Sequence, residues 1–424
     1  MLLKFKFKNF KSFRDEVCLD LTATKITEFS DRNFEVGNIK VLPVASIFGA
    51  NASGKSNVID AFRFMRKYII DSLYEMAPDR RESNGRRRTK VMPFFFDDKI
   101  KNDNSMFEVY FVLTNDESEK IYRYGFEVNE NIVKEEWLSY RAKTSREDFK
   151  TIYYRNEKEI DWKGVDTKIS KNIEASLREN VLIMTLGTIL NEPLLTKIFR
   201  LFRETNVINF GDPEEDYYIY LGAGYTRYIL EEKNQEEVKK YLGSFDSSIV
   251  GISAERHLAK VLGQEDEIHV YVHHKNNNSD EIVKLPMIFE SAGTQKMFYL
   301  YTFFKGSLMT GNAILIDELN SKLHPLLIRN IVQMYLNNDI NKLHAQLIFT
   351  SHDVWQLKSK IMRRDEIWFT EKDENGISNL YPLSDFIDKD GDKIRKDVDY
   401  LKNYIYGKYG AIPDLKGFEG VFNL

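Results

Sequence analysis

The sequence is poor in cysteine and has no long apolar run. A single cysteine, Cys18, stands among 424 residues, which excludes an internal disulfide and a zinc site built from several cysteines, and is typical of a reducing cytosol. No apolar run approaches the ~20 residues that a membrane helix needs. The opening MLLKFKFKNF alternates apolar and basic residues, which predicts a strand and not a signal peptide. We therefore expect a cytoplasmic protein that does not associate with membranes.

The sequence also lacks an excess of positive charge. The formal net charge of −4 argues against a protein that coats nucleic acid with a generally basic surface. One stretch is strongly basic, RRESNGRRRTK from Arg80 to Lys90. Its simpler interpretation is a solvated loop, and the alternative is a contact with nucleic-acid phosphates or with an acidic partner.

Hydrophobic periodicity predicts an α/β protein. Residues 1 to about 50 read as strands that lead into a glycine-rich loop, and the following helix carries Val58, Phe62, Met65 and Ile69 on one face. Residues from about 91 to 165 alternate like an antiparallel sheet, and their tyrosines are interpreted as sheet packing, with base stacking as the alternative. Residues from about 167 to 245 read as mostly helical.

The last third of the sequence predicts alternating helices and strands. A hairpin-like pair, EIHVYVHHK and EIVKLPMIF, precedes a helix over about 292–308. The strand AILIDE, a helix over about 325–336, the strand AQLIFT and a final hairpin follow. No heptad run predicts a coiled-coil arm.

The segment GANASGKSN fits the phosphate-loop pattern G-x-x-x-x-G-K-[ST]. It lies between a buried strand and an amphipathic helix, the context that this motif requires. Gly49 and Gly54 would let the backbone amides face a phosphate, Lys55 would neutralise phosphate oxygens, and Ser56 would ligate Mg²⁺. The alternative is a coincidental glycine turn. The predicted nucleotide-binding residues are Gly49, Asn51, Ser53, Gly54, Lys55, Ser56 and Asn57.

Two strands end in polar side chains that suit phosphate chemistry. Asp317 and Glu318 follow the run Ala313 to Ile316, and His352 follows the strand QLIFT. Because the carboxyl ends of parallel strands share one edge, these side chains should converge on the phosphate loop. We expect Asp317 to hold Mg²⁺ through water, Glu318 to act as general base, and His352 to contact the γ-phosphate or the attacking water. The alternatives are an exposed acidic turn and a structural histidine.

A second helix start is suited to an anion. Ser291 is a good N-cap, and Ala292 and Gly293 leave the amides of the first turn uncovered, so that a phosphate could approach the positive end of the helix dipole. A capped core helix is the alternative interpretation.

Together these motifs resemble the head of an ABC-type ATPase. More narrowly, NFKSF, GANASGKSN, ESAGTQK, IDELNSKLHPLL, FTSHD and KYGAIPDL resemble the bacterial AAA-family ATPases grouped with RloA and AbiL, relatives of the OLD-family and PARIS heads. The resemblance implies a P-loop NTPase head that binds ATP and Mg²⁺ in a homodimer. It assigns a signature acting on the partner's ATP to Ser291, Ala292, Gly293, Thr294 and Gln295, and a D-loop to Asn320, Ser321, Leu323 and His324.

The sequence departs from the ABC pattern at two places. Asn320 stands where a D-loop often carries an aspartate. No glutamine occurs between the phosphate loop and Asn234, so the usual Q-loop ligand of Mg²⁺ is unassigned. We divide the chain into an N-terminal half-head over 1–75, an inserted β-sheet and helical lobe over 76–285 that partly belongs to the head sheet, and a C-terminal half-head over 286–424.

The resemblance implies an ATP-hydrolysing dimeric switch in bacterial anti-phage defence of the abortive-infection type. Such ATPases act with a separate effector, a Toprim-type nuclease or a toxin. One alternative is an SMC-like DNA-repair or chromosome-maintenance head that contacts DNA through Arg86, Arg87 and Arg88. The other is a scaffold that binds ATP and hydrolyses it negligibly.

Overall fold

A computed structural model describes most of the chain. The described residues are 1–72, 90–113, 119–130, 132–145, 147–212, 228–257, 266–358, 361–387, 394–395 and 398–413. The basic stretch Arg80–Lys90 lies outside them except for Lys90, so its predicted contact with nucleic acid stays a prediction. In the described part, no helix is both long enough and apolar enough to cross a bilayer.

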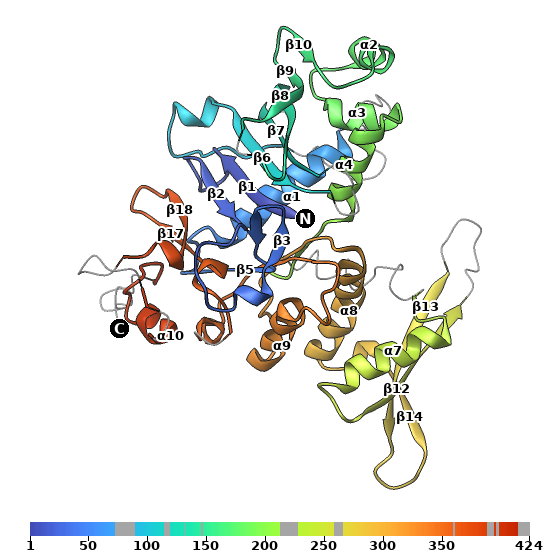
Figure 1. Ribbon diagram of the computed structural model, residues 1–424. Helices are drawn as coiled ribbons and strands as arrows, with labels where there is room; N and C mark the ends of the chain where they lie inside the picture. Colours follow the sequence, from blue (N-terminus) through green and yellow to red (C-terminus); the bar gives the residue numbers. More distant parts are fainter. Residues whose placement is uncertain are drawn as a thin grey trace, which may run out of the picture.

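The predicted parallel sheet forms the centre of the molecule (Figure 1). Its strands lie in the order β11-β15-β16-β5-β17-β18, of which the first five are parallel and β18 is antiparallel. Strands β5, β15 and β16 are buried along their whole length, as expected for strands that helices cover on both faces. The bounds are β5 Val44–Gly49, β11 Asn206–Asn209, β15 Ile314–Asp317, β16 Leu347–Thr350, β17 Ile367–Lys372 and β18 Ser378–Pro382.

A seven-stranded antiparallel sheet lies beside the central one, in the order β10-β9-β8-β7-β6-β1-β2. The antiparallel pattern predicted for about 91–165 is confirmed, and β1 extends the same sheet by pairing with β6. The two segments therefore form one continuous sheet. The bounds are β1 Leu2–Lys8, β2 Val17–Asp20, β6 Ser105–Phe111, β7 Lys120–Asn129, β8 Ile132–Ala142, β9 Lys150–Arg155 and β10 Ile160–Trp162.

Helix α1, Lys55–Asp71, is packed between these two sheets. The four apolar residues predicted on one face are buried, and so are Phe64 and Tyr68 on other sides of the helix. One core cluster joins α1 to residues of β1, β6 and β7 on one side and of β5, β15 and β16 on the other. Burial from both sides holds the start of α1 at the edge of the central sheet.

The described part of the region predicted as mostly helical contains four helices and one strand, and the last helix, α7 Glu232–Gly243, packs in the lobe described below. The others come first in the chain. These are α2 Thr167–Ser176, α3 Ile183–Ile189, α4 Pro193–Glu204 and β11. The segment between α2 and α3 is not helical because the buried carboxylate of Glu136 accepts hydrogen bonds from the amides of Ile183 and Met184 and so starts a new helix there. The helical prediction was wrong for β11, which pairs in parallel with β15.

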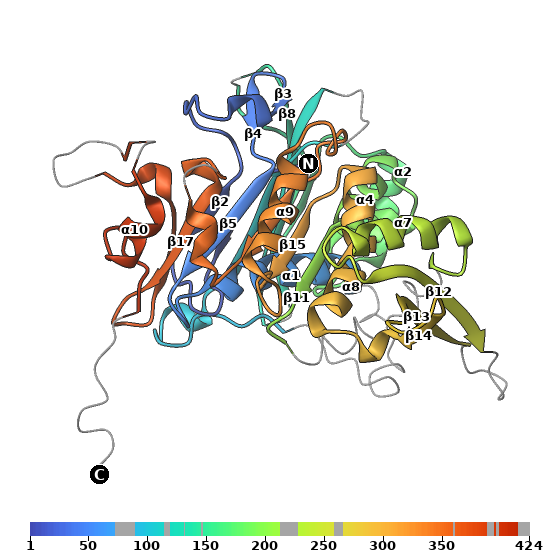
Figure 2. The ribbon, with the colours of Figure 1, turned by 90° about the horizontal axis from the view of Figure 1, so that it is seen from below.

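A smaller lobe projects beside the C-terminal half of the head (Figures 1 and 2). Helix α7 Glu232–Gly243 packs on a three-stranded sheet made of β12 Ile249–His257, β13 Glu267–Lys275 and β14 Ile282–Pro286. The predicted hairpin of β13 and β14 is confirmed. The remaining elements are β3 Phe34–Val36, β4 Ile39–Val41, α8 Ala292–Thr310, α9 Pro325–Leu336 and α10 Tyr400–Ile405.

Candidate nucleotide-binding site

The phosphate loop joins the end of β5 to the start of α1. Gly49 has φ +154° and Gly54 has φ +114°, conformations that favour glycine. A Cβ atom would lie 2.4 Å from the Thr370 carbonyl oxygen at Gly49 and 2.7 Å from the Ser378 hydroxyl at Gly54. Glycine is therefore required at both positions by backbone conformation and by space.

Hydroxyl groups from segments that are distant in the sequence support this loop through hydrogen bonds. The Ser378 hydroxyl lies 2.7 Å from both the Ser53 carbonyl oxygen and the Ser12 hydroxyl. Asn57 donates to the Ser12 hydroxyl at 2.7 Å, and the hydroxyls of Ser53 and Thr370 are 2.6 Å apart. Ser53 and Asn57, predicted to bind nucleotide, thus have partners within the protein. Sequence reasoning missed Ser12, Thr370 and Ser378 as supports because they lie far from the motif in the chain.

The side chain of Lys55 is buried without a carboxylate bonded to it. Its ammonium group donates to the carbonyl oxygens of Gly49 at 2.9 Å and Ala50 at 2.8 Å, and the residue is 5% exposed. Burial lowers the pKa of Lys55 to about 8, although Asp317 and Glu318 act in the opposite direction. A cation that has only neutral oxygen partners fits a phosphate anion.

Asp317 ends β15 beside the start of α1. Its carboxylate is 2% exposed and accepts hydrogen bonds from the hydroxyls of Thr350 and Ser56. Burial raises the pKa of Asp317, while these two hydrogen bonds act to lower it. The adjacent hydroxyl and carboxylate oxygens are ligands that suit Mg²⁺, so the residues present fit the predicted metal.

Glu318 takes a left-handed backbone conformation, with φ +54°. Its amide donates to the Thr350 hydroxyl at 2.8 Å, so one threonine of β16 orients both acidic residues. The end of β11 lies next to the Glu318 side chain, because a Cβ atom on Gly211 would be 3.2 Å from Glu318 Oε1 and 3.1 Å from Asn209 Oδ1. Sequence reasoning missed Asn209 because it placed this segment in a helical region.

His352 follows β16 at the same edge of the central sheet. Its backbone amide donates to Asn320 Oδ1 at 3.0 Å. The pKa of His352 is lowered first by partial burial and then by the charge of Lys55, and Glu318 and Asp317 oppose this. The four groups therefore lie within electrostatic reach of one another. The hydrogen bond from the His352 amide requires a side-chain oxygen at position 320. Asparagine supplies this oxygen, as aspartate would.

The predicted signature begins α8. The Ser291 hydroxyl accepts a hydrogen bond from the Thr294 amide at 3.1 Å, as an N-cap does. Ser291 and Ala292 are exposed, and a Cβ atom on Gly293 would lie 3.1 Å from the Lys322 carbonyl oxygen. Gln295 donates to the Glu290 carbonyl oxygen at 2.7 Å. The helix start is thus both capped and open to a second molecule.

Lys296 joins the signature helix to the turn that follows Glu318. Its buried ammonium group donates to the carbonyl oxygens of Leu319 at 3.0 Å and Ser321 at 2.8 Å, and it lies 3.6 Å from the centre of the Phe210 ring. The predicted D-loop residues Asn320 to Leu323 occupy this turn, and His324 caps α9. The sequence pattern did not single out Lys296.

Comparison with protein families identifies the chain. The profile of the family described as "AAA domain, putative AbiEii toxin, Type IV TA system" matches residues 44–354. The chain belongs to this AAA family. The match begins at β5 and extends beyond His352, so it includes the phosphate loop, the signature, Asp317 and Glu318. Among curated proteins, no sequence matches the chain significantly.

Solved structures similar to the chain include an SMC head and a recombination mediator protein. The SmcHead bound to the C-winged helix domain of ScpA is 15% identical, with TM-score 0.36 over 90% of this chain and 97% of that one. The recombination mediator RecF with ATPrS is 14% identical, with TM-score 0.34 over 90% and 98%. TM-scores this low carry no argument. The order of the central strands and the family match support the fold, an ABC-type P-loop ATPase head.

Proposed function

We propose that this protein is an ATP-hydrolysing switch whose two heads close on ATP. The observation that carries the proposal is the meeting of Lys55, Asp317, Glu318 and His352 at one sheet edge. They come from three places, namely the start of α1, the end of β15 and the end of β16, and all have the chemistry that phosphoryl transfer needs.

Each residue in this proposal has a role that follows from its surroundings. Lys55 binds the β- and γ-phosphates in place of its two carbonyl partners. Ser56 and Asp317 would hold Mg²⁺, which when bound neutralises phosphate charge. Glu318 is oriented by Thr350 and accepts a proton from the attacking water. His352 is held by Asn320 and contacts the γ-phosphate.

The exposed signature supports closure as a homodimer. Ser291 and Ala292 present the start of α8 to solvent, where the amides and the helix dipole favour an anion. We propose that this tip binds the γ-phosphate held by a second copy, and that the D-loop beside Gly293 lies at the same interface. Lys296 then links the signature to the turn that carries Glu318.

The biological task that we propose is anti-phage defence of the abortive-infection type. The family description names an AbiEii toxin and a type IV toxin–antitoxin system, which supports this choice. In the described part, no group of three or more His, Cys, Asp or Glu side chains is arranged to hold a metal. We propose that a separate effector, a Toprim-type nuclease or a toxin, carries out the step that follows ATP hydrolysis.

Substituting Glu318→Gln tests the proposed function. The amide keeps the shape of the side chain but cannot take the proton, so ATP turnover should fall by about 10²-fold or more, while ATP remains bound and the closed dimer accumulates. Turnover is measured by phosphate release and binding by a fluorescent ATP analogue. Glu232→Gln, at an exposed position on α7, is the control and should retain full turnover.

The same experiment separates the alternatives. Unchanged turnover in Glu318→Gln would remove Glu318 as the base. Negligible turnover in the unmodified protein, with ATP still bound, would indicate the scaffold. Stimulation of turnover by DNA ends would favour the SMC-like head.

A further inference from the structure

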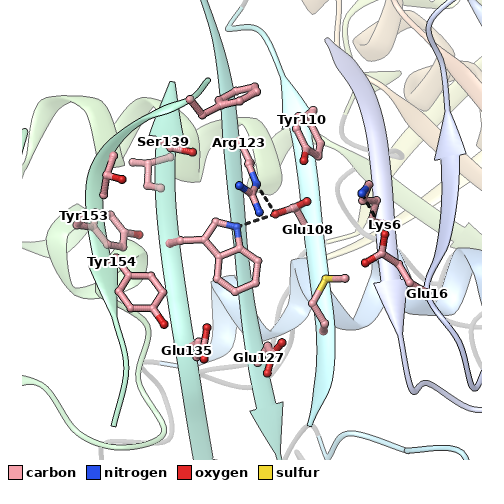
Figure 3. Close-up of a pocket in the computed structure, with 15 residues that line it drawn as sticks. Lys6, Glu16, Glu108, Tyr110, Arg123, Glu127, Glu135, Ser139, Tyr153 and Tyr154 are labelled. Atoms are coloured by element: carbon pink, nitrogen blue, oxygen red, sulfur yellow. Dashed lines mark hydrogen bonds and ion pairs between the residues drawn. The ribbon is translucent and has the colours of Figure 1, made fainter. Parts of the chain in front are cut away.

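The outer face of the seven-stranded sheet is hollowed into a cavity of about 540 Å³ (Figure 3). Successive side chains of a strand point to opposite faces of the sheet, and the outward-facing ones line this cavity. On β6, Phe107, Val109 and Phe111 point into the core, whereas Glu108 and Tyr110 line the cavity. Strands β1, β7, β8 and β9 contribute the other lining residues, and a shift in the register of β8 and β9 lies at this place. The cavity lies on the face opposite α1, away from the nucleotide-binding site.

The wall of the cavity is fixed by contacts within the protein. The Trp137 ring lies over Gly125, where a Cβ atom would be 2.5 Å from the ring. Its indole N–H donates to Glu108 at 2.8 Å, and Arg123 donates to the same carboxylate oxygen at 2.5 Å. Lys6 pairs with Glu16 at 3.0 Å. The two cations that line the cavity are thus neutralised by two of its carboxylates.

Two further carboxylates in the cavity have no cationic partner. Glu127 on β7 and Glu135 on β8 are direct partners in the strand register, and both line the cavity. Glu127 accepts a hydrogen bond from Asn104 at 2.9 Å, and Glu135 is bonded to the Tyr154 hydroxyl. No ion pair joins either glutamate to a described residue. Like charges directly opposite each other destabilise a sheet. Because the other two carboxylates are paired with cations, these two leave the cavity with an unbalanced charge of about −2.

A buried hydroxyl in the same cavity also lacks a partner. Ser139 lines the cavity between Arg123 and Thr151, and Figure 3 shows it there. The residue is 6% exposed, and its hydroxyl makes no hydrogen bond to any residue that the structure describes. Buried polar groups without partners are rare in folded proteins. This hydroxyl indicates that a polar group completes the cavity, and the two glutamates, which lie at the other end of it (Figure 3), favour a group with positive charge.

We propose that this cavity binds a basic segment of a protein partner through an arginine or lysine side chain. The carboxylates of Glu127 and Glu135 would accept its N–H groups, and the Tyr154 ring suits a cation, whereas Trp137 already has the Arg123 guanidinium 5.8 Å from its ring centre. The volume admits a short segment and is larger than a single inorganic ion needs. This site goes beyond the proposed function and does not depend on ATP hydrolysis.

Peptide binding to the full chain tests the site. The probe is a fluorescein-labelled Gly-Arg-Gly-Arg-Gly peptide, compared with a peptide in which citrulline replaces arginine. The double variant E127Q/E135Q should weaken the arginine peptide by about tenfold or more, because two charge-assisted bonds are lost. The same variant should melt at a higher temperature than the unmodified protein, because the like-charge pair is gone. A misfolded variant would show a lower melting temperature.

The variant E232Q/E281Q is the matched control, because it removes two exposed carboxylates outside the cavity. It should bind the peptide as tightly as the unmodified protein. Equal binding by E127Q/E135Q and this control would overturn the proposal, as would equal affinity for the citrulline peptide. Spermidine is the second probe. If spermidine binds more tightly than the peptide and displaces it, the site takes a small amine and the proposed protein partner is wrong.

Discussion

Glu366 is a carboxylate that the fold keeps away from water. It is buried just before β17, where its Oε2 accepts the Arg363 amide at 2.8 Å and its Oε1 has no partner among the described residues. Burial raises the pKa of Glu366 to about 8. The folded state then holds the proton of Glu366 more tightly than the unfolded state does. The contribution of Glu366 to the free energy of unfolding is therefore greatest below the ordinary pKa of a glutamate and declines as the pH rises toward 8.

Substituting Glu366→Gln should remove this decline. We expect the melting temperatures of variant and unmodified protein to be similar at pH 5 and the variant to melt higher at pH 8, by about 1 °C per kcal/mol gained. Differential scanning calorimetry at both pH values measures the difference. Glu232→Gln, at an exposed position, should change neither value. A constant difference across this pH range would show that Glu366 is not protonated in the folded protein.

At the scale of residues, the motifs predicted which side chains meet but not what supports them. Gly49 and Gly54 follow from the phosphate-loop pattern, because the pattern itself encodes the backbone conformation. Thr350 and Ser378 could not be predicted, because their roles depend on the register of strands far apart in the chain. Small hydroxyl residues are also too common to signal a function on their own.

At the scale of elements, long periodic segments were predictable and short ones were not. Helix α9 spans Pro325–Leu336 as predicted, because a clear apolar pattern and a proline mark it. Strand β11 has four residues and no alternation long enough to detect. Its position is decided by pairing with β15, a tertiary contact. This miss concealed Asn209, whose side-chain oxygen lies, like Glu318 Oε1, next to Gly211.

Lys296→Met tests whether α8 is coupled to the turn after Glu318. The change removes the donor to the buried carbonyl oxygens of Leu319 and Ser321, which costs about 1–3 kcal/mol for each unsatisfied group. We expect a lower melting temperature and strongly reduced ATP turnover, with ATP binding retained. Lys305→Met is the control, because Lys305 lies on the same helix but contacts Glu237 of the lobe. Equal turnover in the two variants would contradict the coupling.

At the scale of the whole molecule, one chain carries the two halves of the proposed ATP site at separate places. These half-sites are the phosphate loop, with the residues around it, and the signature at the start of α8. The phosphate loop begins α1 between the two sheets, and Ser291 begins α8 beside the lobe (Figure 2). In the described part of the chain, no hydrogen bond joins Ser291 to the phosphate loop, whereas Lys296 joins α8 to the turn after Glu318. The sequence predicted both half-sites but not the continuous sheet that unites β1 with β6, because strand order across such a distance leaves no local pattern.

Closure of two copies is tested by comparing two substitutions at one position. In a Glu318→Gln background with ATP, Ser291→Ala removes the capping hydroxyl, which costs about 1 kcal/mol, and should still dimerise. Ser291→Arg adds bulk at the exposed helix start and should stay monomeric, while each chain binds ATP as before. Light scattering measures the mass, and Ser279→Arg, on an exposed turn of the lobe, should dimerise normally. If Ser291→Arg also closes, Ser291 is only a cap, and the interface lies elsewhere on the head.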